Sequence, residues 1–321
     1  SDNPRTRQIM EGRVSPEAIR LVPTTIHPSE MFWRQLRFGD FDVSEMSMST
    51  LTILTSQGNR DWVGLPIYTM RKFFHTEIVY HKDSGINVPT DLKGKRVGVP
   101  EYQQTAAIWP RGVLQHEFGV KPSDMTWFME RNDDRSHGHS TGFKAPQGVS
   151  VSPAPLNSNL GEMLLKREID AIVHYIANNN LVDRSRVDVT ADPNIRFLFP
   201  DREAESARYF KKTGIYPINH IMVVKRGVYE QHPWIALNLY SAFLNAMDQV
   251  RKDALPWLAP YYDTGLVDLD VKRVIAKTPM PYGLRAARHV LETVTQYVYE
   301  QGLCERRVAL EEIFAPNTLD L

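Results

Sequence analysis

The sequence predicts a two-lobed α/β fold with a ligand cleft between the lobes. The chain has 321 residues, of which 42% are hydrophobic, and this is enough for about two packed cores. In the middle of the chain a strand, a polar turn, a helix, a glycine and a further strand follow one another, which is typical of α/β proteins. The chain would leave the first lobe near 97–102 and return near 215–220. We therefore expect residues 1–97 plus 221–321 to form lobe one and residues 98–220 to form lobe two.

Strands are expected where β-branched and aromatic residues form short apolar or alternating runs. In chain order these runs are 41–43, 62–68, 76–80, 96–99, 125–129, 171–175, 195–199 and 216–224. Helices are expected where apolar residues recur at helical spacing. They are 6–10, 29–37, 51–55, 103–117, 160–167, 204–213 and 230–252, followed by a mostly helical remainder to residue 312 with loops at 256–265 and 279–283. Ser29 can cap the second helix, and Gly39, Gly119 and Gly214 can end three of them.

Composition excludes several classes of partner and site. Lys plus Arg and Asp plus Glu both number 38, so the formal charge of zero argues against nucleic acid or an anionic membrane as a partner. A single cysteine, Cys304, excludes an internal disulfide and a multi-cysteine metal site. No apolar run approaches the roughly 20 residues that span a bilayer. We expect a cytoplasmic protein, although a secreted protein that has lost its signal peptide would look the same.

Two further features set expectations about organisation. The chain starts in a loop or helix cap at Asp2-Asn3-Pro4, so we expect a trimmed N-terminus or an absent first strand. Segment 131–155 is charged and then rich in His, Gly, Ser and Pro. A stretch of this length is expected to be an irregular excursion, such as a lid or an arm. Together with the region of Trp234 it predicts a subunit contact, and hence a homo-oligomer.

The stretch FDVSEMSMST at 41–50 predicts one lip of the cleft. It begins as a strand and then fills with small hydroxyl residues, which can end a strand and open a helix. Free backbone N–H groups at a helix start, together with serine hydroxyls, suit an anion. The turn at 101–105 is a similar strand-to-helix junction and supplies a second lip. Ligands of open α/β sheets bind at such strand ends.

Several stretches of the sequence resemble the 4,5-dihydroxyphthalate decarboxylase family. FDVSEMS at 41–47 and GIYPINH at 214–220 are the more specific, whereas DLKGKRVG at 91–98 resembles many type II periplasmic-binding-protein-like sequences. Smaller matching pieces extend the resemblance over nearly the whole chain: Arg5-Thr6, Phe74-His75, Arg111-Gly112 and His232-Pro233-Trp234.

The resemblance implies a type II periplasmic-binding-protein-like fold that is used as a lyase. It implies decarboxylation of a small aromatic dicarboxylate, 4,5-dihydroxyphthalate, to protocatechuate without an organic cofactor. The sequence departs from the family pattern at the absent first strand, at segment 131–155 and at His174, and the last two bear on the substrate. Two alternatives stay open: a solute-binding protein for an aromatic or anionic ligand, and another lyase on the same fold.

The implied reaction needs a proton donor, and histidine is the usual choice near neutral pH. A hydroxyl para to the departing carboxylate pushes electrons to that ring carbon, which an acid must protonate. His75 is one candidate, with the alternative of a half-buried structural histidine. His220 is the other, on the returning segment, with the alternative of a strand histidine bonded to a carbonyl. His174 and Tyr175 end a strand and point toward the cleft, although a structural role is favoured for them.

The implied substrate also needs a clamp for the carboxylate that stays. Arg5 is the first candidate, because a guanidinium fork matches a carboxylate, with a surface arginine as the alternative. Arg71 is a reserve, as is Arg111, which more simply makes an ion pair between helices.

Hydroxyl and amide groups complete the predicted site. They are Ser47, Ser49, Tyr102, Gln104 and Thr105 on the two lips and Tyr216 and Asn219 on the returning segment. Ser47, Ser49 and Thr105 would bring two helix N-termini toward one anion, or would be plain helix caps. Glu45 would hold a catalytic histidine or a ring hydroxyl, with a solvated carboxylate as the alternative. His137-Gly138-His139 is interpreted as a flexible loop, so no metal is expected.

Overall fold

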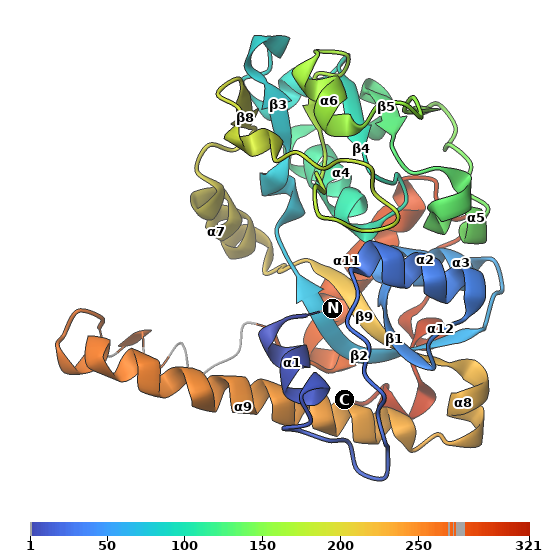
Figure 1. Cartoon of the computed structure of the whole chain (residues 1–321), viewed down its shortest axis with the longest axis vertical. Coiled ribbons are helices and arrows are strands. Elements are labelled where there is room, and N and C mark those ends of the chain that lie inside the picture. The colour runs from blue at the N-terminus through green and yellow to red at the C-terminus, as the bar shows by residue number, and fades with distance from the viewer. Residues whose placement is uncertain (1, 269, 272, 274–279) are drawn as a thin grey trace.

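The computed structural model describes residues 2–268, 270–271, 273 and 280–321. Within these residues the strands form two separate sheets, of three and six strands. Figure 1 shows the six-stranded sheet in the upper part of the molecule and the three-stranded sheet in the lower part, each with helices around it. The predicted two-lobed α/β fold is therefore confirmed.

The three-stranded sheet forms the core of the lower lobe. Its central strand β9 (Ile218–Lys225) pairs antiparallel with β1 (Val43–Ser47) and with β2 (Trp62–Arg71). Nearly all residues of β2 and β9 are buried, as expected for strands covered on both faces. The register places Ser47 directly opposite His220, so the ends of two strands supply neighbouring polar side chains.

Helices from both ends of the chain surround this sheet. They are α1 (Pro4–Met10), α2 (Pro28–Phe38), α3 (Met48–Ser56), α8 (Arg226–Gln231), α9 (Ile235–Asp263), α11 (Leu284–Glu300) and α12 (Leu310–Ile313). His27, not Ser29, is the N-cap residue of α2, because Pro28 occupies the first helical position that proline favours. Gly39 ends α2 in the left-handed conformation, with φ of 64°.

The six-stranded sheet forms the core of the upper lobe. Its strands are β3 (Val79–His81), β4 (Arg96–Val99), β5 (Thr126–Met129), β6 (Ser150–Pro153), β7 (Ala171–Ile172) and β8 (Ile195–Phe197), in the order β6-β5-β4-β7-β3-β8. β4 runs parallel to β5 and β7, whereas β3 runs antiparallel to both of its neighbours. The helices of this lobe are α4 (Thr105–Phe118), α5 (His137–Thr141), α6 (Leu160–Leu165) and α7 (Arg202–Thr213).

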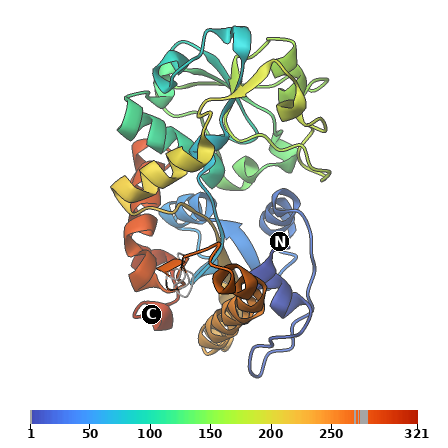
Figure 2. The same cartoon turned by 90° about the vertical axis from the view of Figure 1, so that its left-hand side faces the viewer.

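The chain crosses between the lobes earlier than the sequence predicted. β3 and β4 hydrogen-bond into the six-stranded sheet, so residues 79–97 belong with the upper lobe by sheet membership. We therefore propose boundaries at about 72–78 on the outward crossing and 213–217 on the return. Figure 2 shows the two lobes joined where these crossing segments run side by side. The expected boundary at residue 97 cuts through β4, because a buried strand has the same sequence pattern in either lobe.

Segment 131–155 is not a free arm. It contains α5 and the edge strand β6, and Arg131, Ser136 and His137 are buried. Its first part docks on the lower lobe, since Trp33 donates to the carbonyl of Asp134 at 2.9 Å and Gln57 donates to the carbonyl of Thr141 at 2.6 Å. This irregular segment thus contacts both lobes. The homo-oligomer stays a prediction.

Three other elements differ from the expectation. Residues Phe74–Glu77 form a 3₁₀ turn, so only the end of the predicted strand 76–80 is extended. The predicted helix 230–252 breaks at His232, and α9 then continues to Asp263 through Pro256 and Pro260. The predicted loop 256–265 is therefore mostly helical. Each proline leaves one helix carbonyl without its N–H partner, and the helix tolerates this because that part of it is exposed to water. Residue 279 of the predicted loop 279–283 lies outside the described residues.

None of the helices within the described ranges has the length and apolar character needed to cross a membrane.

Glu77 ties the outward crossing to the upper lobe at one end of the cleft. Its carboxylate lies 2.5 Å from Lys72 Nζ on the outward crossing and 3.5 Å from Arg202 Nη2 at the start of α7. His174 Nδ1, beyond β7, lies 3.8 Å away. Burial alone would raise the pKa of Glu77, but the interactions with His174 and Lys72 outweigh it and lower the pKa from 4.5 to about 2.

This pairing predicts a specific pH dependence of stability. Because the Glu77 pKa is lower in the folded chain than in the unfolded chain, its contribution is complete above pH 4.5 and is lost as pH falls toward about 2. We expect Glu77→Gln to lower the free energy of unfolding by about 1–3 kcal/mol near neutral pH. Urea unfolding across this range should show the difference from wild type shrinking with acidification. A difference that stays constant would contradict the link.

Helix α11 predicts a second stability effect, because it packs against α4 of the other lobe. A Cβ atom at Gly112 would overlap the ring of Tyr297. We expect Gly112→Ala to lower the free energy of unfolding by about 1–3 kcal/mol, measured by urea denaturation. Gly227→Ala in α8 is the matched control, since its Cβ would meet none of the described atoms within 4 Å. That change should stabilise the protein by up to about 1 kcal/mol, and equal effects would refute the packing argument.

Candidate active site

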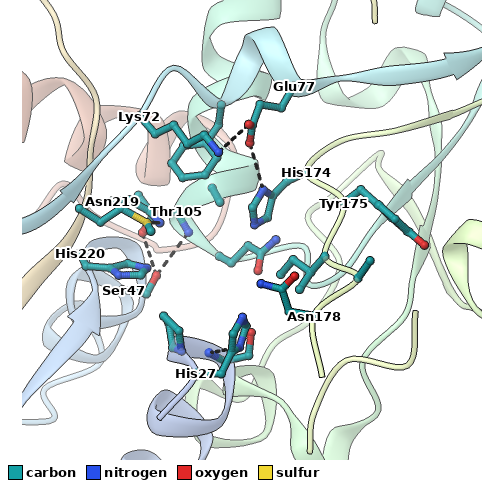
Figure 3. Close-up of a pocket in the computed structure, with 18 of the residues that line it drawn as sticks. His27, Ser47, Lys72, Glu77, Thr105, His174, Tyr175, Asn178, Asn219 and His220 are labelled. Atoms are coloured by element: carbon teal, nitrogen blue, oxygen red, sulfur yellow. Dashed lines mark hydrogen bonds and ion pairs between the residues drawn. The ribbon is translucent and has the colours of Figure 1, made fainter. Parts of the chain in front are cut away.

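A cavity of about 600 Å³ lies between the two lobes, within the usual range of about 300–1,000 Å³ for ligand sites. Figure 3 shows polar side chains from both lobes converging on it. Predicted site residues that line the cavity are Ser47, Gln104, Thr105, His174, Asn219 and His220. Tyr175, which the sequence placed near the cleft, lines it as well.

A cluster of hydroxyl groups joins two helix N-termini at the cavity wall. Ser47 precedes α3, and its Oγ lies 2.8 Å from Thr105 Oγ1, in the first residue of α4. Thr105 Oγ1 also accepts the backbone N–H of Ser49 at 2.8 Å. The positive ends of both helix dipoles therefore meet at one place, as the sequence predicted. This arrangement suits a carboxylate, because helix N-termini bind anions.

His220 is backed by a buried carboxylate. Its Nδ1 lies 3.2 Å from Glu45 Oε2, which also accepts the hydroxyl of Thr69 at 2.8 Å. Burial alone would raise the pKa of Glu45, but its hydrogen bond with His220 and the further charge interactions around it together outweigh burial and hold the pKa well below its usual value. An ionised Glu45 only accepts hydrogen bonds, so it keeps a proton on His220 Nδ1 and leaves Nε2 as the nitrogen available to a ligand. Glu45 itself does not line the cavity.

His27 and His137 share this wall with His220. The rings of His137 and His220 both pack edge-on against Phe32, with centroids 5.4 and 4.8 Å from it. His27 Nδ1 accepts the backbone N–H of Ser29 at 3.3 Å, so a neutral His27 carries its proton on Nε2. Burial lowers the pKa of His27 and lowers that of His137 to about 4. Both rings are therefore neutral near pH 7.

Arg131 holds the cleft together from the same side. Its fully buried guanidinium donates to Glu101 and to Asp183, each at 2.7 Å, and to Ser29 Oγ of the other lobe at 2.6 Å. Burial opposes the charge of Arg131, but the two carboxylates outweigh it and raise its pKa. The pKa of Asp183 is lowered by the same pairing, which overcomes its burial. Arg131 is thus already paired on both sides.

The opposite end of the cavity carries the Glu77 group, as Figure 3 shows for Lys72, Glu77 and His174. His174 has φ of 61°, a left-handed conformation that costs a non-glycine residue about 1–2 kcal/mol. This turn directs the chain after β7 along the cavity, toward Tyr175 and Asn178. Lys72 and Arg202 line the cavity at this end, and both form ion pairs with Glu77.

His75 lies outside the cavity. It is 1% exposed, its Nε2 lies 3.2 Å from Glu205 on α7, and its ring packs between Phe199 and Tyr209. The 3₁₀ turn that replaces the predicted strand points this side chain into the packing beneath α7. His75, which was expected to reach the substrate, is therefore not among the residues that line the cavity.

Neither arginine of the predicted clamp lines the cavity, and both have hydrogen-bond partners within the lower lobe. Arg5 donates to the carbonyl of Thr69 at 2.9 Å, and Arg71 donates to the carbonyl of Pro281 at 2.7 Å. Burial lowers the pKa of Arg71 to about 10. Arg111, the other reserve, is buried beneath Tyr102, with its Cζ 3.8 Å from the ring centroid.

Three predicted hydroxyl residues do not line the cavity. Ser49 is fully buried and donates to the carbonyl of Gln103 at 2.6 Å, behind the hydroxyl cluster. Tyr102 is buried against Arg111, and burial raises its pKa. Tyr216 stacks on Phe73 outside the cavity, with ring centroids 4.8 Å apart.

Several residues that line the cavity were not predicted from the sequence: His27, Lys72, Glu77, Arg131 and His137. His27 stands before Pro28, which is a signal for a helix start but not for a ligand site. His137 was assigned to a flexible loop, whereas it is buried and His139 is exposed, so the two do not share a site. Across the described residues, no three or more His, Cys, Asp or Glu side chains form a group that could hold a metal ion.

Comparison with known proteins found similarity to one protein family and to solved structures. Residues 22–170 match the family described as ABC transporter, phosphonate, periplasmic substrate-binding protein. Among solved structures, the alkanesulfonate-binding protein SsuA from Xanthomonas axonopodis pv. citri is 15% identical with a TM-score of 0.49, covering 88% of this chain and 82% of that one.

Curated relatives are more informative. The 4,5-dihydroxyphthalate decarboxylase of Pseudomonas putida is 31% identical over 207 residues, which cover 64% of this chain and 78% of that protein. The protein of the same name from Comamonas testosteroni is 30% identical over 325 residues, covering 98% of this chain and 94% of that protein. Similarity at this level over almost the full length of both proteins shows that the chain belongs to the 4,5-dihydroxyphthalate decarboxylase family.

Proposed function

We propose that this protein is a cofactor-independent decarboxylase of a hydroxylated aromatic dicarboxylate, with 4,5-dihydroxyphthalate as the substrate and protocatechuate as the product. The observation that carries the proposal is the pairing of His220 with the buried Glu45 at the wall of a polar cavity. Membership of a family whose curated relatives bear this name supports the same reaction class.

His220 is proposed to act as the general acid. With Glu45 bonded to Nδ1 behind it, the protonated imidazole would deliver a proton from Nε2 to the ring carbon that bears the departing carboxylate. The carbon–carbon bond to the carboxylate then breaks, and its electron pair returns to the ring. Carbon dioxide leaves, and His220 regains its proton from solvent. Edge-on packing against Phe32 fixes the orientation of the imidazole ring.

The carboxylate that stays is proposed to bind at the hydroxyl cluster. Ser47 and Thr105 lie at the starts of α3 and α4, so both helix dipoles favour a negative charge there. Because Ser47 is paired with His220 across β1 and β9, the anchored carboxylate would lie beside the proton donor. Asn219 lines the same part of the cavity and supplies a further amide.

A solute-binding protein is the second candidate function. The match of residues 22–170 to a periplasmic substrate-binding family favours it, since such proteins bind anions in the same kind of cleft. The difference lies in the buried carboxylate behind His220, which a receptor does not need. A receptor would release its ligand unchanged.

Turnover of 4,5-dihydroxyphthalate tests the proposal. We expect the purified protein to release carbon dioxide and form protocatechuate. Liquid chromatography measures the protocatechuate, and a carbon dioxide detector measures the gas. Phthalate, which lacks the electron-donating hydroxyls, should give no product. Tight binding of 4,5-dihydroxyphthalate with complete recovery of unchanged ligand would reject the decarboxylase and support the receptor.

Separate substitutions of two histidines test the proposed general acid. We expect His220→Asn to lower kcat by about a hundredfold to ten-thousandfold, the usual contribution of a general acid. His75→Asn is the matched control, because His75 is buried outside the cavity beside Glu205. It should lower the thermal midpoint and leave the kcat of the folded protein within about twofold. Comparable losses of kcat in both variants would argue against His220 as the acid.

A further inference from the structure

His137 is one of several cavity-lining residues with a buried polar atom that has no partner among the described residues, and the proposed reaction gives it no role. His137 is 2% exposed and lines the cavity, and within the described parts of the chain nothing hydrogen-bonds its Nε2. A buried nitrogen without a partner costs about 1–3 kcal/mol, so such an atom usually has a ligand to meet.

The surroundings of His137 determine which nitrogen carries its proton. Nδ1 lies 3.3 Å from Thr50 Oγ1 and 3.8 Å from Glu101 Oε2. A carboxylate only accepts hydrogen bonds, so this side of the ring favours N–H at Nδ1. In a neutral imidazole the proton on Nδ1 leaves a lone pair on Nε2, directed away from Glu101.

Hydrogen bonds hold the carboxylate of Glu101 in place, and Glu101 in turn lies beside the ring of His137. Glu101 Oε1 accepts the backbone N–H of Gly138 at 2.8 Å, and Oε2 accepts Arg131 Nη1 at 2.7 Å. Burial keeps the His137 pKa at about 4, so the ring stays neutral at working pH. His137 therefore presents a fixed hydrogen-bond acceptor to the cavity. His27 presents a donor instead, since its Nδ1 is occupied by the N–H of Ser29.

An acceptor selects one part of the proposed substrate. The carboxylates of an aromatic dicarboxylate are ionised near pH 7 and have no proton to donate. Its ring hydroxyls are the groups that can donate to His137. Both His137 and His220 pack on Phe32, so their ring centroids lie no more than about 10 Å apart, which lets one aromatic ring reach both.

We propose that His137 recognises the ring hydroxyl para to the departing carboxylate by accepting its hydrogen bond at Nε2, an inference that rests on the decarboxylase function proposed above. The bond would increase electron donation from that oxygen toward the carbon that His220 protonates. It also gives the site a preference for hydroxylated over plain phthalates, because an unmet lone pair in the cavity opposes binding of the ring without the hydroxyl.

Binding measurements separate this role from turnover. Dissociation constants for 4,5-dihydroxyphthalate and phthalate are measured by calorimetry on the wild type, His137→Leu, His137→Gln and His139→Leu. We expect wild type to prefer the dihydroxylated ligand, and His137→Leu to reduce this preference by about tenfold to a hundredfold. His137→Gln restores an acceptor and should recover part of the preference. His139→Leu changes the exposed neighbour on α5 and should leave it intact.

The outcomes distinguish the two proposals. A preference that is lost in His137→Leu supports this inference, even if no carbon dioxide is released and the decarboxylase itself is rejected. An unchanged preference in a folded His137→Leu overturns the inference, as does a wild type that binds both ligands equally. If His137→Leu does not fold, ¹⁵N NMR of wild-type histidines decides. The Nε2 resonance of His137 should move with 4,5-dihydroxyphthalate and not with phthalate, and the absence of any shift rejects the role.

Discussion

The geometry of the cleft depends on the buried guanidinium of Arg131. Its fork of donors binds Glu101 and Asp183 in the upper lobe and reaches Ser29 in the lower lobe. A buried charge is tolerated only when such partners satisfy it, so the lobes are held at the separation that this group requires. The same bonds place α2 against the upper lobe, which brings His27 and Phe32 to the cavity wall.

Three histidines on one wall of the cavity differ in their hydrogen-bonding roles, because a different partner lies beside Nδ1 of each ring. His220 has the carboxylate of Glu45 behind it, His137 has Glu101 and Thr50, and His27 has the backbone of Ser29. Two of these partners favour a proton on Nδ1 and one excludes it. A single residue type can therefore supply a proposed proton donor, a hydrogen-bond acceptor and a hydrogen-bond donor within one cavity. Burial sharpens the differences, because it keeps His137 neutral.

The proposed function assigns different tasks to two parts of the cavity. Helix N-termini joined by Ser47 and Thr105 would hold a carboxylate, because helix N-termini favour anions. The proposed proton transfer depends on a buried carboxylate placed behind a histidine on the central strand of the lower sheet. One residue on β1 and one on β9 supply this pair. The proposed reaction uses the same anion site for positioning.

The sequence alone determined the α/β class, most of the elements and the two strand-to-helix turns at the cavity wall, because these follow from local signals. Strand ends filled with Ser and Thr identified Ser47 and Thr105, and a polar residue at the start of a strand identified His220. Local signals do not report which way a side chain points within a turn, so His75 was placed in the cleft although it packs beneath α7. They also do not report which lobe a loop meets. Only the tertiary structure could bury His137 and pair Arg131 across the cleft, since their partners lie on segments far apart in the chain.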